Sequence, residues 1–234
     1  MDRRSFIELL GGTVVGGGEI VSARQDDERY RNPRVTASLV RYWEVEARET
    51  DRMPLRSRGI DLGGAYTTTL IYKDTRLTAA FDERLRRDFE GIVGAFITTR
   101  ITFDSPLSAF AQPSLVTGLA KRRFERTARR RGFSRLRERE PAERETTQEQ
   151  ATAEYEGYYS IDRYTETPPS NISRFPGIGR DNRVQTVLYF DVSRSGRSLI
   201  LAAGIRPTDE LLGVLNRDDD AYRRELLRLM HSVR

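Results

Sequence analysis

The chain of 234 residues has no cysteine and one histidine. The absence of cysteine excludes disulfides, thiol catalysis, cysteine-bound zinc or iron–sulfur centres and a cysteine-linked lipid anchor. A single histidine excludes histidine-rich metal sites and argues against a serine–histidine catalytic pair. Lysine is also scarce: Lys73 and Lys121 are the only two, so arginine supplies the other 38 of the 40 cationic side chains.

Long apolar runs are missing as well. Nowhere does the chain contain the roughly 20 consecutive apolar residues that a membrane-spanning helix requires. Hydrophobic residues make up 37% and charged residues 32% of the chain. This balance is typical of a soluble globular protein and not of an integral membrane protein.

The N-terminal residues resemble a twin-arginine export signal. Arg3 and Arg4 are followed by Ser5, Phe6 and an aliphatic residue, and then by a weakly apolar, glycine-rich stretch. Small residues precede a cleavage site that we place after Ala23. The sequence therefore predicts an exported protein that loses residues 1–23. In the alternative interpretation the arginine pair occurs by chance and the protein stays in the cytoplasm.

The rest of the chain alternates strand patterns with helix patterns. The charged residues 24–34 predict a linker, and residues 35–234 predict a single domain. That domain is predicted to be an α+β fold, in which helices pack on one face of an antiparallel sheet and a helix closes the C-terminus. The predicted strands are 35–49, 66–72, 95–103, 133–140, 151–165, 184–192 and 198–205; the predicted helices are 81–92, 114–131 and two after Thr208, the second capped by Asp218; residues 50–64 are predicted to be a loop.

This order of features resembles uncharacterised exported proteins of halophilic archaea. The resemblance rests on the arginine-pair signal, Trp43 in the first strand pattern, the 95–103 strand, the 114–131 helix and a hairpin that closes on residues 201–207. It implies an α+β sandwich similar to PsbP and Mog1, and it implies no reaction, cofactor or catalytic residue. The chain differs from many of those proteins because it lacks a lipobox cysteine and is basic.

The cationic side chains gather in residues 121–139. Ten arginine or lysine residues against two glutamates give this segment a net charge of +8. Arg122, Arg126, Arg129 and Arg130 share one face of the predicted helix, opposite its apolar stripe. Guanidinium groups clamp phosphates and carboxylates, so this face predicts a site for an anionic polymer or lipid headgroups, with nucleic acid as the alternative partner. A solvated helix face in an arginine-rich protein is the other interpretation.

The remaining patterns carry weaker chemistry. Asn216, Asp218 and Asp220 are spaced like the start of a calcium loop, but the glycine and the distal glutamate of such a loop are missing. Gly177 and Gly179 lack the third glycine of a dinucleotide-binding loop. Glu154 and Glu156 share one face of a predicted strand but have no facing carboxylate, and His231 lies near the end of the chain. We therefore predict no catalytic residue, no metal site and no cofactor. Asn171 begins an N-glycosylation sequon in a predicted loop, which fits export.

Two classes of function agree with these observations. The favoured one is an exported, non-enzymatic accessory protein that acts outside the cell or at its surface. The alternative is a cytoplasmic basic protein that binds nucleic acid or anionic surfaces through residues 121–139.

Overall fold

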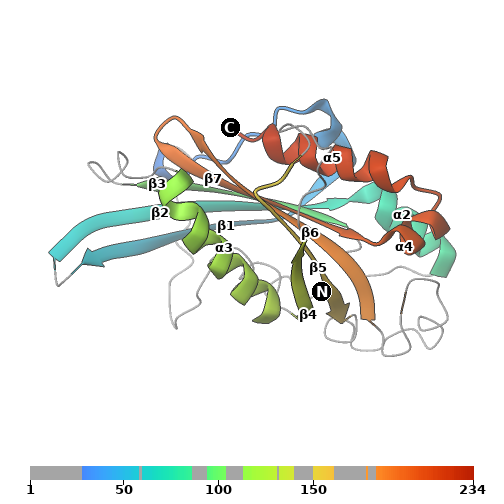
Figure 1. Cartoon of the computed structure of the whole chain (residues 1–234). Helices are drawn as coiled ribbons and strands as arrows, with labels where there is room; N and C mark the ends of the chain where they lie inside the picture. Colours follow the sequence, from blue (N-terminus) through green and yellow to red (C-terminus); the bar gives the residue numbers. More distant parts are fainter. Residues whose placement is uncertain are drawn as a thin grey trace.

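An antiparallel sheet forms the centre of the molecule (Figure 1). The computed structural model describes residues 28–57, 60–85, 94–103, 113–130, 132–139, 150–160, 178 and 183–234. Within them, seven strands pair in the order β1-β2-β3-β7-β6-β5-β4. Their bounds are β1 Trp43–Ser57, β2 Ile60–Asp74, β3 Ala95–Phe103, β4 Phe133–Arg139, β5 Ala153–Ser160, β6 Arg183–Ser195 and β7 Ser198–Pro207.

Two short 3-10 helices precede the first strand, and the α-helices connect or follow the strands. Their bounds are η2 Glu28–Tyr30, η3 Ser38–Tyr42, α2 Thr75–Leu85, α3 Pro113–Arg130, α4 Asp209–Val214 and α5 Asp219–His231. The Asp218 carboxylate accepts a hydrogen bond from the Ala221 backbone N–H at 2.7 Å, which confirms the predicted N-cap of α5. No helix in the described part of the chain is long and apolar enough to cross a membrane.

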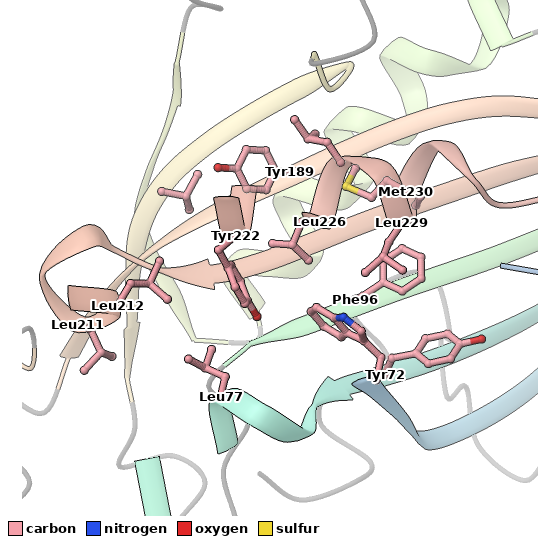
Figure 2. Packing of buried hydrophobic residues seen from close by; sticks show 14 of the residues in the cluster. Tyr72, Leu77, Phe96, Tyr189, Leu211, Leu212, Tyr222, Leu226, Leu229 and Met230 are labelled. Carbon is pink, nitrogen blue, oxygen red and sulfur yellow. The ribbon is translucent and has the colours of Figure 1, made fainter. Parts of the chain in front are cut away.

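Apolar side chains cover both faces of the sheet. Neighbouring residues of one strand alternate between two cores: Phe96 and Tyr189 belong to the core under α2, α4 and α5, whereas Ile97 and Phe190 belong to the core under α3. Figure 1 shows α3 and α5 on opposite sides of the sheet, and Figure 2 shows how closely the α5 core packs. The α+β class, the antiparallel sheet and the closing helix are thus confirmed. The expectation that helices pack on one face is corrected, because buried apolar residues on both faces require cover on both.

A buried carboxylate joins α2 to the sheet and to α5. Asp74 is 1% exposed and accepts hydrogen bonds from the backbone N–H groups of Arg76 and Leu77 at 2.9 and 3.2 Å. The Arg76 guanidinium donates to Asp74 Oδ2 at 3.0 Å and also pairs with Glu225 of α5. Glu225 in turn accepts from Trp43 Nε1 at 2.9 Å, so the single tryptophan reports on this junction.

The N-terminal part of the described chain lies on the sheet instead of extending away from it. Residues 28–34, which the charge pattern predicts to be linker, include η2 against β2 and β3. Arg34 exchanges two backbone hydrogen bonds with Arg234, at 2.9 and 2.8 Å, and Val35 forms a β-bridge with Val233. The C-terminus is therefore tied down, although His231 lies only three residues before the end of the sequence.

The longest departure from the sequence pattern is at residues 50–64. Glycine and proline there predict a loop, but β1 and β2 continue as a hairpin with pairs such as Thr50–Thr68 and Asp51–Thr67. Because β1 is an edge strand, a proline at position 54 can be accommodated at a register shift without removing a ladder bond from a central strand. Similarly, the predicted 35–49 strand begins only at Trp43, after η3.

Candidate anion-binding surface

Helix α3 exposes three of the four predicted arginines. Phe124 and Ala128, four residues apart, are buried against the sheet at 2% and 0% exposure. Arg122 and Arg126 lie about half a turn away from this stripe, on the outer side of α3, and Arg129 lies about a third of a turn away; all three are exposed. Arg130 is the last residue of α3, and its side chain lies outside the described residues.

The flanks of α3 are neutralised by neighbouring strands. Lys121 forms an ion pair with Glu138 of β4. Glu125 accepts a hydrogen bond from the Tyr155 hydroxyl of β5 at 2.9 Å. Burial raises the pKa of the Tyr155 hydroxyl well above its usual value, and the hydrogen bond to Glu125 raises it further. The phenol therefore stays protonated and remains a hydrogen-bond donor. These contacts engage Glu138 of β4 and Glu125 of α3 itself.

Within the part of the chain that the structure describes, the exposed arginines of α3 have no such acidic partners. Arg126 Nε donates at 3.4 Å to the backbone carbonyl of Arg122, one turn earlier in the same helix. Arg129 donates at 3.3 Å to the carbonyl of Leu136 and so ties the end of α3 to β4. Among the residues that the structure describes, Arg122 and Arg126 have no carboxylate partner. Two guanidinium groups one turn apart, which no described carboxylate neutralises, can therefore bind an external anion.

The edge strand β4 divides the basic segment between the two faces of the sheet. Glu138 lies opposite Tyr155, whose side chain belongs to the core under α3. Arg137 and Arg139, opposite Glu156 and Glu154, consequently lie on the other face. Arg139 forms an ion pair with Glu154 at 3.2 Å. The segment with a net charge of +8 is thus not one continuous patch.

A residue that the sequence analysis did not single out lies at the bend between these faces. Arg135 is exposed and has a positive φ of 52°, at a register shift between Ser134 and Arg137. Its guanidinium carbon is 5.9 Å from the centroid of the Tyr158 ring. No sequence signal pointed to this conformation, because left-handed backbone is expected at glycine or asparagine and not at arginine.

A second cluster missed by the sequence analysis surrounds Arg206, which is 3% exposed. Its guanidinium donates to the Tyr189 hydroxyl at 2.9 Å, to Asp209 at 3.1 Å and to Asp219 at 3.3 Å. The two aspartates begin α4 and α5, so one buried cation holds both helices to β7. Burial, together with the nearby charge of Asp209, raises the pKa of Asp219 to about 6, although Arg206 opposes this shift.

The other candidates occupy ordinary structural positions. Glu154 and Glu156 share a face of β5, as predicted; Glu154 pairs with Arg139, and Glu156 accepts a hydrogen bond from Gln185. His231 Nε2 is 4.0 Å from Asp191 Oδ2. Within the described ranges, no three potential metal ligands come together. Arg3, Arg4, Ala23 and Asn171 lie outside the described residues.

Comparison with known proteins identifies a family but no activity. The chain belongs to the DUF6517 family, a domain of unknown function, whose model matches residues 34–234. Neither the curated proteins nor the solved structures provide a match to the chain.

Proposed function

We propose that this DUF6517 protein is exported and acts at the cell surface or outside the cell as a non-enzymatic binding protein, whose ligand is anionic. The observation that carries the proposal is the outer side of α3. Arg122 and Arg126 lie one turn apart and are exposed, and the residues that the structure describes offer them no carboxylate. By contrast, Lys121 on the flank of the same helix is paired with Glu138.

The position of the arginines supports binding over a purely structural role. Arg129, in the last turn of α3, satisfies a carbonyl of β4 and favourably meets the negative end of the helix dipole. Arg122 lies eight residues before the end of α3, outside the last turn where that effect acts. Among the described residues, it also covers no buried carboxylate. An external anion would give its charge a partner.

Export is supported by the sequence at Arg3, Arg4 and Ala23. The test is N-terminal sequencing of the native protein, together with fractionation of the producing cells. A mature chain that starts close to Arg24 and is found outside the cytoplasm is the expected result. An intact Met1 on a cytoplasmic protein would overturn export and favour the nucleic-acid alternative.

The binding surface is tested with a pair of double variants. Arg122→Ala/Arg126→Ala removes the two outer arginines of α3, and Arg224→Ala/Arg228→Ala removes two exposed arginines at the same spacing on α5. Both variants lose two charges, so a general effect of net charge is common to both. We expect the α3 variant alone to lose affinity for polyphosphate and polygalacturonate, and its logarithmic salt slope to decrease by about 2.

Two outcomes would contradict this assignment. Equal losses in the α3 and α5 variants would show that only net charge matters. Tighter binding of a single-stranded oligonucleotide than of either polymer, again dependent on the α3 pair, would favour a nucleic-acid-binding function.

A further inference from the structure

The backbone at Arg135 is in a conformation that arginine rarely adopts. With φ at 52°, it lies in the left-handed region, which costs free energy for a side chain with a Cβ atom. Three residues earlier the chain does place a glycine at a positive φ, Gly132 at 97°. An arginine therefore occupies a position where glycine or asparagine would fit with less strain.

Packing does not account for this choice of residue. Arg135 is exposed, and within the described part of the chain its side chain meets no carboxylate; its guanidinium lies over the face of Tyr158, 5.9 Å from the ring centroid. A β-bulge bends an edge strand and re-aims a side chain, and bulges often occur beside binding sites. Here the bulge places a cation that no described carboxylate neutralises at the edge of the sheet, immediately after the arginine-bearing helix.

We propose that Arg135 is a ligand-binding residue, and that the ligand is a linear anionic polymer that contacts α3 and continues around the β4 edge. This inference rests on the proposed function, because it uses the same α3 surface. It adds the shape of the ligand and one residue that selects for it. Arg137, exposed on the far side of the edge, extends the track onto the opposite face.

The geometry favours a flexible polymer over a membrane surface. Tyr155 and Tyr159 belong to the α3 side of β5, so the alternate residue Tyr158, under Arg135, faces the other side. A flat bilayer can contact one face of the sheet at a time. A chain with repeated negative groups can bend around a sheet edge and contact Arg122, Arg135 and Arg137 together, because each contact needs only one group of the polymer.

The test compares ligands of different length on the full chain. Arg135→Asn removes the guanidinium and suits the left-handed backbone, so folding, followed through the fluorescence of Trp43, should be retained or improved. We expect this variant to lose about three- to tenfold in affinity for long-chain polyphosphate, with a salt slope reduced by about 1. Binding of tripolyphosphate, which is too short to reach around the edge, should be unchanged.

Further variants test whether the charge of residue 135 is what matters. They also distinguish failure of this inference from failure of the proposed function. Arg135→Lys keeps the cation and should keep the salt slope of the natural protein. If Arg122→Ala/Arg126→Ala loses binding while Arg135→Asn does not, the proposal for Arg135 fails and the α3 site stands. If neither variant changes binding, the proposed function fails. Stronger binding to vesicles of anionic phospholipid than to polyphosphate, unaffected by Arg135→Asn, would overturn the polymer in favour of a membrane.

Discussion

The cluster around Arg206 makes stability depend on pH in an unusual direction. Asp219 has a side chain that is 27% exposed and shares Arg206 with Asp209. In the folded protein its pKa is about 6, compared with an ordinary value of 3.8, mainly because burial disfavours the charged form. The folded state thus binds this proton more tightly than the unfolded state, so above pH 6 the ionised carboxylate costs folding free energy, and the cost shrinks as the pH falls through 6 and vanishes below the unfolded pKa of 3.8.

Asp219→Asn removes this cost without creating a cavity. A shift of about two pKa units corresponds to roughly 3 kcal/mol as an upper limit. Because part of the side chain is in water, solvent screening reduces this figure, and we expect about 1 kcal/mol. The variant should therefore be about 1 kcal/mol more stable than the natural protein at pH 7.5, with a clearly smaller difference at pH 4.5, because the cost vanishes only below the unfolded pKa of 3.8. The pKa of Asp209 is lowered: burial alone would raise it, but its hydrogen bonds to Arg206 and Asp219 outweigh that effect, so this carboxyl titrates at lower pH than Asp219.

Urea unfolding followed by Trp43 fluorescence measures this difference, since the tryptophan is buried next to α5. Glu210→Gln is the matched control: it removes one negative charge from the first turn of α4, but from an exposed side chain. The control should show no gain at pH 7.5. A gain for Asp219→Asn that is the same at both pH values, or a loss at pH 7.5, would refute the assignment of the raised pKa to this carboxyl.

Three further predictions concern packing, each measured by the same urea unfolding. Gly94→Ala should destabilise by about 1–3 kcal/mol, because its Cβ would collide with the Tyr222 hydroxyl and lie 2.9 Å from Leu77; an unchanged midpoint would contradict this packing. Gly213→Ala in α4, where a Cβ meets nothing within 4 Å, should instead stabilise by about 0.5 kcal/mol. Leu226→Ala, at a fully buried position in α5, should cost about 3 kcal/mol, and a cost below 1 kcal/mol would show that α5 packs loosely.

The sequence predicts correctly those strands and turns that depend only on residues close together in the chain. The 95–103 strand has the predicted bounds, and the hairpin of β6 and β7 turns at Gly196 with a φ of 60°, as a tight turn requires. Strand β7 carries a signal for its surroundings as well. All ten residues of β7 are buried, and the continuous apolar run from Leu199 to Ala203 is typical of a strand covered on both faces. That run predicts a helix layer on each side of the sheet.

Contacts between distant residues could not be predicted in this way. Nothing near Arg206 in the sequence shows that Tyr189 and Asp219 meet it, because only the register of β6 on β7 and the return of α5 bring them together. The same applies to the 121–139 segment. Its charge is a property of the sequence, but its division by the β4 edge follows from the pairing of Glu138 with Tyr155.

A cationic side chain of this segment releases counterions from a polyanion only if its own charge is not already paired within the protein. Lys121 lies next to Arg122 on α3, but the ion pair with Glu138 already neutralises its charge, so it should contribute little to the binding of a polyanion. Arg122 is exposed and has no carboxylate partner among the described residues, so its charge is available to the ligand. We therefore expect Lys121→Ala to leave the salt slope of polyphosphate binding unchanged and Arg122→Ala to lower it by about 1. Equal slopes in the two variants would mean that total charge controls binding, and that ion pairs within the protein do not select the contacts.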